Sequence, residues 1–433
     1  MTARAGIVVT GTEVLTGRVA DANGPWLAEA LRGRGVDVGR VVVVGDRPDD
    51  LAAAVGFLAG EGGHDLVITT GGLGPTADDL TARVVAQVQG RALRLDEGLR
   101  ALIDDIVRRI ADERGWQGPL GDALDEGTRK QALVPDGATW LHPTGTAPGL
   151  VVPPTGAGAP VVVLPGPPGE LRAMWDAVLV DPVVTSALAG AEPLEQRTLR
   201  MWGPPEAELA VVLREHGEQH SMAGLEVTTC LRGGELEVVT RYSPAAAGAY
   251  ADLEATLLER FADTLVSADG RSVDEVVADA LRAGGLTVAT AESCTAGLLA
   301  GRFADRPGSS AYLLGGLVTY SNEAKTALLD VPAALIERVG AVSEEVALAM
   351  AAGARARLGA DLGFGVTGVA GPDGGTADKP VGLVHVALVG TLPDGTAVSE
   401  HRRLRLPGDR MSVRARTVTT CLHLLRGVLT SRS

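Results

Sequence analysis

Two stretches far apart in the chain each run from an apolar strand through a tight turn into a helix, and this pattern limits the fold most. In the first, residues 65–81, a β-branched strand ends at a pair of glycines and a helix is expected from about Asp78. In the second, residues 286–304, a strand leads through a short polar turn into a helix expected over 295–304. Such strand–helix alternation favours a mostly parallel sheet with helices on both faces. The sequence therefore predicts an α/β protein.

The chain has 433 residues, and a domain typically has roughly 150, so the length allows about three domains. Strand and helix signals alternate over residues 1–170 and again over 267–433. Between them, residues 171–266 follow the order β-α-β-β-α, with a hairpin around Gly233-Gly234. We predict two three-layer α/β domains joined by a small α+β domain.

Composition excludes several classes of protein. The chain is 45% apolar and carries a net charge of −15, which disfavours general binding to nucleic acid. No apolar run approaches the ~20 residues of a membrane helix, and the first residues do not resemble a signal peptide. Three cysteines at uneven spacing form neither a disulfide framework nor a zinc pattern. We expect a cytoplasmic protein that acts without a membrane and without direct contact to nucleic acid.

The first candidate site follows the strand at 65–70. Gly71, Gly72 and Gly74 allow backbone amides to approach a phosphate, while the hydroxyl of Thr76 is a possible donor. Asp78 and Asp79 are carboxylates of the kind that hold Mg²⁺ or Mn²⁺. The alternative is purely structural, because glycines end many strands and Asp is common at helix N-termini.

The second candidate site surrounds Ser293, which lies at a strand–helix junction where a nucleophile and helix amides meet. The alternative is that Ser293 or Thr295 caps the helix. Cys294 has no neighbouring histidine in sequence to activate it, which favours an inert buried thiol. The histidines of the last domain, His385, His401 and His423, do not lie in glycine-rich turns, so they support a serine–histidine triad only weakly.

Lysine supplies a sharper indication of the base. The chain has only three lysines, Lys130, Lys325 and Lys379, beside 36 arginines (39 − 3). A lysine kept in such a composition is a candidate for a group that loses its proton, although a surface lysine is the simpler alternative. On a helix that starts near Ser321, Lys325 and Tyr320 approach one side of a pocket. A glycine-rich loop after the strand at 362–366 adds the hydroxyl of Thr367 and possible anion-binding amides.

Several ordered motifs resemble the CinA family. In the first domain these are Gly11-Thr12-Glu13-Val14-Leu15-Thr16-Gly17, the Gly71–Asp79 stretch, Gly145-Thr146-Ala147-Pro148-Gly149 and Leu164-Pro165-Gly166-Pro167-Pro168-Gly169-Glu170. The Gly71–Asp79 stretch alone is shared with the molybdopterin-binding fold of molybdenum-cofactor enzymes. The last domain resembles the CinA C-terminal domain, a nicotinamide-nucleotide amidase, through the Ser293, Tyr320–Lys325 and Thr367 segments. The middle domain would match the KH-like domain of the family.

For the first domain, the resemblance implies a metal-dependent ADP-ribose pyrophosphatase. Glu13, Asp78 and Asp79 would hold a divalent ion such as Mg, Mn or Co. The residues expected to bind the nucleotide are Asn23, Gly71, Gly72, Gly74, Thr76 and Thr146. The chain departs from the family at Asp21 and His142, where asparagine is common.

For the last domain, the resemblance implies that Ser293 attacks the carboxamide of nicotinamide mononucleotide, without any cofactor. Lys325 and Tyr320 would exchange the proton, and Thr367 with Gly368 would bind or stabilise the intermediate. The residues expected to bind the substrate are Glu292, Thr295, Gly297, Gly368, Gly371 and Lys379. Ala296 stands where the family usually has glycine, a change tolerable unless φ is positive there.

The complete prediction is therefore a cytoplasmic enzyme of pyridine-nucleotide recycling that acts on nicotinamide mononucleotide and ADP-ribose. The resemblance further implies a homodimer. Two alternatives are a molybdopterin- or nucleotide-binding enzyme of cofactor biosynthesis and a non-catalytic competence or DNA-damage partner protein. Binding of pterin would distinguish the first, and a partner function that survives loss of Ser293 would distinguish the second.

Overall fold

The computed structural model describes residues 3–115 and 121–430. It divides into two compact units that meet at Glu195 and Gln196. The first unit extends past the predicted boundary at residue 170, because Leu171, Met174 and Trp175 of the next helix are buried against its sheet. Among the described residues, no helix combines the length and apolarity needed to cross a membrane.

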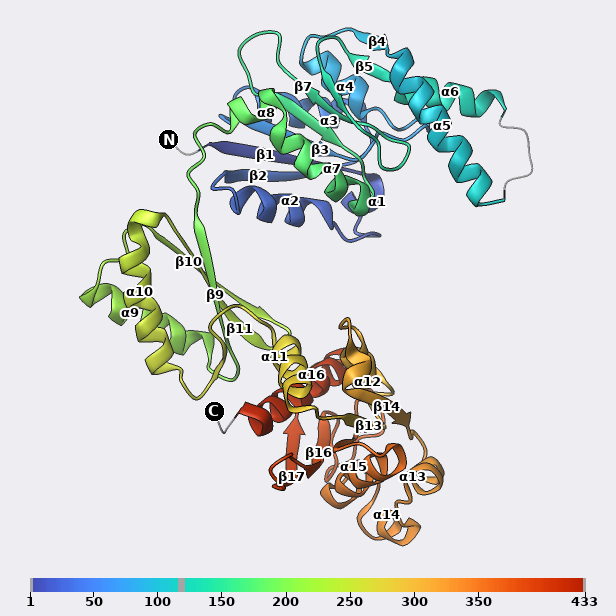
Figure 1. Cartoon of the computed structure of the whole chain (residues 1–433), viewed down its shortest axis with the longest axis vertical. Coiled ribbons are helices and arrows are strands. Elements are labelled where there is room, and N and C mark those ends of the chain that lie inside the picture. Colours follow the sequence, from blue (N-terminus) through green and yellow to red (C-terminus); the bar gives the residue numbers. More distant parts are fainter. Residues whose placement is uncertain (1–2, 116–120, 431–433) are drawn as a thin grey trace. The chain divides into compact units, whose positions relative to one another are not determined.

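The first unit is a sheet with helices on both faces (Figure 1). Its strands are β1 (Arg4–Thr10), β2 (Asp37–Val44), β3 (Leu66–Thr70), β4 (Leu93–Leu95), β5 (Leu133–Pro135), β6 (Thr139–Leu141), β7 (Gly149–Val152) and β8 (Val161–Leu164). Its helices are α1 (Thr12–Leu15), α2 (Asn23–Arg32), α3 (Pro48–Ala59), α4 (Thr81–Val88), α5 (Glu97–Glu113), α6 (Asp122–Gln131), α7 (Pro168–Val180) and α8 (Pro182–Ala187).

The strand order of the six-stranded sheet is β2-β1-β3-β8-β7-β6. The first four strands are parallel, whereas β7 pairs antiparallel with both β8 and β6. One face is covered by α2, α7 and α8, and the other by α3, α4 and α5. Strand β3 is therefore buried at every residue, as expected of a sheet covered on both sides.

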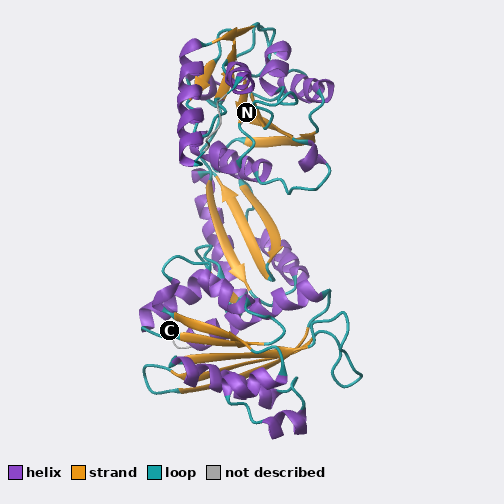
Figure 2. Ribbon diagram, turned by 90° about the vertical axis from the view of Figure 1, so that its right-hand side faces the viewer, coloured by secondary structure: helices purple, strands orange, loops and turns teal. Residues whose placement is uncertain are grey.

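The second unit contains two separate sheets, and these appear as two groups of strands in Figure 2. Its strands are β9 (Glu195–Met201), β10 (Leu225–Arg232), β11 (Glu235–Tyr242), β12 (Leu265–Ser267), β13 (Val288–Glu292), β14 (Leu313–Val318), β15 (Leu362–Gly368), β16 (Leu383–Thr391) and β17 (Ala397–Arg405). Its helices are α9 (Glu206–Gln219), α10 (Ala247–Arg260), α11 (Val273–Gly284), α12 (Leu298–Ala304), α13 (Asn322–Leu329), α14 (Ala333–Val339), α15 (Glu344–Leu358) and α16 (Arg410–Thr430). Single 3₁₀ turns lie at Pro244–Ala246 and Ser309–Ala311.

The smaller sheet has the order β10-β11-β9-β12, with α9 and α10 packed on it. The predicted β-α-β-β-α order is confirmed, and β12 adds an edge strand that the sequence did not predict. The predicted hairpin is also confirmed, with Gly233 and Gly234 at φ +60° and +93° in its turn.

The smaller sheet joins the larger one through buried polar contacts. The Glu235 carboxylate lies 3.3 Å from a guanidinium nitrogen of Arg200 and 3.1 Å from Nε2 of His423 on α16. Trp202 stacks on the ring of His423 with centroids 3.9 Å apart. The Val273 N–H at the start of α11 also donates to Glu235. These contacts explain why the middle and last predicted domains form one compact unit.

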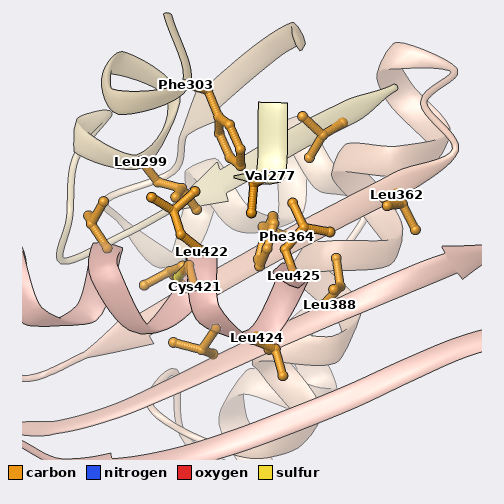
Figure 3. Close-up of a cluster of buried hydrophobic side chains, with 14 of the residues drawn as sticks. Val277, Leu299, Phe303, Leu362, Phe364, Leu388, Cys421, Leu422, Leu424 and Leu425 are labelled. Carbon is orange, nitrogen blue, oxygen red and sulfur yellow. The ribbon is translucent and has the colours of Figure 1, made fainter. Parts of the chain in front are cut away.

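The larger sheet has the order β14-β13-β15-β16-β17. Helices α11, α12 and α16 cover one face, and α13, α14 and α15 cover the other. Figure 3 shows the core beneath the first group, where Phe303 and Leu422 meet Phe364 of β15. Neither β17 nor α16 was predicted from the sequence, although α16 supplies much of this core.

Local signals set several helix ends. Ser272 and Glu275 form the predicted capping box of α11, which stops at Gly285 with φ +59°. Ser343 caps α15 as predicted. Two predicted starts are wrong: α4 begins at Thr81 instead of Asp78, and α12 at Leu298 instead of Thr295. Both turns continue for about three further residues before helical hydrogen bonding begins.

Ala296 lies in the left-handed region, with φ +50°, within the turn before α12. A left-handed alanine costs about 1–2 kcal/mol, because its Cβ crowds the following carbonyl. We predict that Ala296→Gly raises the free energy of unfolding by about 0.5–1 kcal/mol after the entropy of the unfolded glycine is subtracted. Urea unfolding of the two chains measures this change. Asp330→Gly is the control, because Asp330 has φ +55° but asparagine and aspartate tolerate this region. A destabilised Ala296→Gly chain would contradict the prediction.

Candidate functional site

Ser293 directly follows β13, and its N–H donates to the carbonyl of Val366 on the neighbouring strand. Lys325 lies on α13, one turn beyond Ser321, whose hydroxyl caps that helix. The Lys325 ammonium donates to Ser293 Oγ at 3.2 Å. Both side chains are buried, and Lys325 is only 1% exposed. The structure therefore brings together the predicted nucleophile and its predicted proton acceptor.

Three backbone carbonyls surround the same ammonium group. Lys325 Nζ lies 3.0 Å from the oxygen of Thr319, 3.2 Å from that of Tyr320 and 3.4 Å from that of Ser321. Burial lowers the pKa of Lys325, while the neighbouring Cys294 and Glu323 raise it. The neutral amine is thus more accessible than on a surface lysine, and the carbonyls stabilise the ammonium once a proton arrives. This balance suits a group that cycles between the two forms.

Glu292 has a structural task. Its carboxylate accepts hydrogen bonds from the N–H groups of Gly297, Leu299 and Ala300 and from the hydroxyl of Thr290. It therefore caps α12 from five residues upstream and stays buried. The serine-cap alternative is excluded, because neither the Ser293 nor the Thr295 hydroxyl binds the helix. Although predicted to bind substrate, Glu292 has its oxygens directed at the helix.

The remaining predicted residues of this site gather around the ends of β13 and β15. Thr367 Oγ1 donates to the carbonyl of Ala341 at 2.8 Å, and Lys379 Nζ donates to that of Val339 at 2.8 Å. Thr295 is fully buried, and its hydroxyl has no partner among the described residues. Gly297 and Gly371 have φ +91° and +81°, and a Cβ on Gly368 would lie 2.7 Å from the carbonyl oxygen of Leu383.

Tyr320 approaches Lys325 through its carbonyl oxygen, and its side chain points elsewhere. The residue as a whole is 57% exposed, and its phenol oxygen accepts a hydrogen bond from Arg410 at 2.9 Å. The same guanidinium donates to the carbonyl of Gly371, while Arg414 donates to that of Thr295. Neither arginine was predicted from the sequence. Their spacing of one helical turn, after an aspartate that caps the helix start, is the signal that could have found them.

Cys294 is buried, and burial raises the pKa of its thiol to about 11. A thiol with this pKa carries little thiolate at neutral pH. Its assignment as an inert neighbour of Ser293 agrees with the geometry.

The second candidate site lies in the first unit, where the strand order reverses between β1 and β3, a position at which α/β proteins commonly bind ligands. Gly71 and Gly72 have φ +104° and +65°. A Cβ on Gly71 would lie 2.5 Å from the carbonyl oxygen of Thr10. Asn23 Nδ2 donates to Thr70 and Gly166, whereas its buried Oδ1 has no partner among the described residues. Glycine is thus required by the close approach of two strand ends.

Thr76 holds the two predicted aspartates together. Its hydroxyl lies 2.6 Å from an oxygen of Asp78 and 2.6 Å from one of Asp79, and its N–H donates to Asp79. The hydrogen bond from Thr76 lowers the pKa of Asp78. The Lys130 ammonium donates to the Thr76 carbonyl, and burial lowers the pKa of this lysine. Lys130 was singled out only as one of the three lysines, and no role in this site was predicted for it.

Glu13 does not join this group. Its exposed carboxylate folds back over Gly11 at the end of β1. Over residues 3–115 and 121–430, no three His, Cys, Asp or Glu side chains lie close enough to share an ion. Asp78 and Asp79 alone still fit a magnesium-like ion, which commonly takes one or two carboxylates together with substrate phosphates.

A pocket of about 310 Å³ adjoins the aspartates. Its walls are mainly apolar and include Leu73, Leu133 and Leu150, with Asp79 and Lys130 at a polar margin. Gln131 crosses beside it and donates to the Leu73 carbonyl at 2.9 Å, and more weakly to the Thr146 hydroxyl. Apolar walls with a polar margin suit a planar ring attached to a charged group.

The two departures from the family motif have local partners. Asp21 Oδ1 accepts from the N–H groups of Asn23 and Gly24 and so fixes the start of α2. His142 is exposed, and its Nδ1 contacts the carbonyl of Pro143. Asp21 therefore serves the helix, and His142 acts within its own loop.

Comparisons with known proteins match both units. A family model described as the CinA C-terminal domain matches residues 270–429, and one described as a probable molybdopterin binding domain matches residues 6–185. The CinA-like protein of Mycobacterium avium (strain 104) is 53% identical over 437 residues, covering 99% of each chain. That of Mycobacterium tuberculosis (strain ATCC 25177 / H37Ra) is 50% identical, covering 99% of this chain and 98% of its own.

Solved structures match in part. The competence/damage inducible protein CihA from Agrobacterium tumefaciens is 42% identical, covering 35% of this chain and 93% of that chain, with a TM-score of 0.33. The protein CinA from Thermoplasma acidophilum is 31% identical, covering 42% of this chain and 98% of that chain, with a TM-score of 0.35.

We predict that Glu292→Ala lowers the free energy of unfolding by about 2–4 kcal/mol, because it leaves one buried and two partly buried N–H groups without an acceptor. Glu292→Gln keeps one acceptor oxygen and should lose less. Chemical unfolding followed by circular dichroism measures both changes. Glu345→Ala is the matched control, an exposed carboxylate in the first turn of α15 that should cost less than about 1 kcal/mol. Equal losses for Glu292→Ala and Glu345→Ala would contradict the capping role.

Proposed function

Because the chain belongs to the CinA family, we propose that its second unit hydrolyses nicotinamide mononucleotide to nicotinate mononucleotide and ammonia. One observation carries the proposal, namely the buried contact of 3.2 Å between Lys325 Nζ and Ser293 Oγ. A serine hydroxyl beside a desolvated lysine is one of the arrangements that activate a serine nucleophile.

In the acylation step, neutral Lys325 takes the proton of the Ser293 hydroxyl while Oγ forms a bond to the carboxamide carbon. The new ammonium lies among the carbonyls of Thr319, Tyr320 and Ser321, which stabilise its charge. The N–H groups of the turn after Ser293 are the candidates for stabilising the oxyanion. Lys325 then returns the proton to the nitrogen of the breaking C–N bond. Ammonia departs, and an ester remains on Ser293.

In the deacylation step, water gives a proton to Lys325 and attacks the ester carbon. The C–O bond to Ser293 breaks, and Oγ recovers its proton from Lys325. The products are nicotinate mononucleotide and the free enzyme, so no cofactor is consumed.

Two arginines support a phosphorylated substrate. Arg410 and Arg414 extend from the first turns of α16 to the carbonyls of Gly371 and Thr295, which flank the predicted substrate-binding segments. Guanidinium groups pair well with phosphate oxygens. Their positive charge gives a nucleotide an anchor within a strongly acidic chain.

We predict that Ser293→Ala abolishes ammonia release from nicotinamide mononucleotide, because the ester can no longer form. A coupled ammonia assay with purified full-length protein measures the rate, and circular dichroism confirms the fold. Ser310→Ala, a change at an exposed serine, is the control and should keep full activity. Equal rates for wild type and Ser293→Ala would exclude Ser293 as the nucleophile.

We predict that the amidase kcat rises with pH, because only the neutral form of Lys325 accepts the serine proton. Burial lowers the pKa of Lys325, so the rise should lie below the 10.5 of an ordinary lysine. Lys325→Met should lower kcat by at least about 100-fold and remove this limb of the profile. A kcat profile of Lys325→Met that matches the wild type would contradict the assignment of the base.

We further propose that the first unit is a metal-dependent ADP-ribose pyrophosphatase. The proposal rests on the Thr76–Asp78–Asp79 group and Lys130 beside the apolar pocket. Asp78 and Asp79 would hold the ion, which would supply charge stabilisation and activation of water at the diphosphate. Leu73 and Leu150 would pack against the adenine ring, and Lys130 would face the phosphates.

We predict that Asp79→Asn lowers ADP-ribose hydrolysis by at least about 100-fold in the presence of Mg, Mn or Co. The formation of AMP, followed by chromatography, measures the rate. Asp49→Asn, an exposed change on α3, is the control, and Ser293→Ala should leave this activity intact. Tight binding of a pterin without ADP-ribose hydrolysis would favour the cofactor-biosynthesis alternative. A partner function that survives both active-site variants would favour the non-catalytic alternative.

A further inference from the structure

A row of polar side chains extends across the larger sheet from the proposed nucleophile. Thr367 of β15 pairs directly with His385 of β16, and Ser293 lies beside Val366 at the end of β13. Alternate residues of a strand face opposite sides, and Val366, Val384 and Val386 point into the core under α16. Thr367 and His385 therefore lie on the face covered by α15, as does Ser293, whose hydroxyl meets Lys325 of α13.

His385 is connected to solvent through two further side chains. His385 Nδ1 lies 3.0 Å from Nε2 of His401 on β17, and His401 Nδ1 lies 3.3 Å from a carboxylate oxygen of Glu344. Exposure falls along this chain, from 55% for the Glu344 side chain through 16% for His401 to 8% for the whole of His385. The proposed amidase mechanism uses none of these three groups.

The proton positions follow from the acceptors. Glu344 only accepts, so His401 donates to it through Nδ1–H. In a neutral His401, Nε2 is then an acceptor, and His385 donates to it through Nδ1–H. This tautomer leaves a lone pair on His385 Nε2.

Burial and charge favour a neutral His385. Burial together with the neighbouring His401 and Arg403 lowers the pKa of His385 to about 4, although Glu344 acts in the opposite direction. Lys379 also lowers it. His385 therefore presents an acceptor at neutral pH.

The position of His385 determines which part of a bound substrate lies next to this side chain. Two strand spacings separate β13 from β16, which places the backbone of His385 about 10 Å from the end of β13 that precedes Ser293. At that distance from the nucleophile, the part of a bound nicotinamide nucleotide that is present is its sugar and no longer its ring. A lone pair suits a hydroxyl, which donates, and repels a phosphate oxygen.

We propose that His385 Nε2 accepts a hydrogen bond from a ribose hydroxyl of the substrate, with His401 and Glu344 as positioning residues that fix its tautomer. This inference rests on the proposed amidase function. It makes the second unit selective for ribose, independently of the bond that is cleaved.

Binding to the full-length Ser293→Ala protein tests the proposal without turnover. Calorimetry compares nicotinamide mononucleotide with its 2′,3′-dideoxy analogue. We expect a preference of about tenfold for the ribose form, the equivalent of one hydrogen bond. Adding His385→Phe should reduce the preference to about one. His220→Phe changes an exposed histidine that directly follows α9 and should leave the preference unchanged.

The positioning role has a separate readout. His401→Gln keeps an oxygen that accepts from His385 Nδ1–H and should retain most of the preference, whereas His401→Phe should lose it. In chains that keep Ser293, His385→Phe should raise KM with little change in kcat.

An unchanged preference in both His385→Phe and His401→Phe would overturn the inference alone. Failure of the Ser293→Ala chain to bind either nucleotide would instead overturn the proposed amidase function and this inference with it. Far-UV circular dichroism shows which variants are folded. If His385→Phe does not fold, His401→Phe, at a less buried position, tests the same series of hydrogen bonds.

Discussion

The carboxylate of Glu292 is the contact on which the geometry of the second unit depends. The first N–H groups of a helix have no acceptor within the helix itself. Glu292 satisfies three of them from the last residue of the strand. The turn between strand and helix is thereby held in one shape, and the Ser293 hydroxyl is left free to meet Lys325. The positive φ of Ala296 is part of the same turn.

Helix α16 connects this turn with the rest of the unit. Its first turns reach Tyr320, Gly371 and Thr295, and its middle fills the core beside Phe364. Nearer its end, His423 meets Glu235 and stacks on Trp202 of the smaller sheet. The same helix therefore borders the proposed substrate site and joins the two sheets. The middle segment thus has a structural reason to stay with the last one, independent of any ligand of its own.

Much of the fold could be predicted because the signals were local. Strands rich in Val and Ile, the Ser272 capping box and the Gly233-Gly234 turn each carry their own physical reason. Ser293 and Lys325 could be nominated from turn position and lysine scarcity, together with the family motifs. Their contact could not be derived, because 32 positions separate them in sequence. Glu292 was placed with the substrate through the family resemblance, and only the folded helix shows which donors it satisfies.

Tertiary contacts decided the remaining features. Helix α16 mixes arginines, threonines and apolar residues without a clear helical periodicity, so its role emerges only from packing. Arg410 is defined by partners at 320 and 371, far from it in the chain. The family resemblance grouped Glu13 with Asp78 and Asp79, but the strand ends that carry them do not bring Glu13 to Thr76.

The scarcity of lysine has a practical consequence for chemical labelling. Only three primary amines occur on side chains, and that of Lys325 is enclosed by carbonyls and shielded from bulk solvent. A general acylating reagent should react slowly at Lys325. A nicotinamide-shaped electrophile that enters beside Ser293 would meet the amine of Lys325 next to the nucleophile and would mark the enzyme there, against a background of arginines.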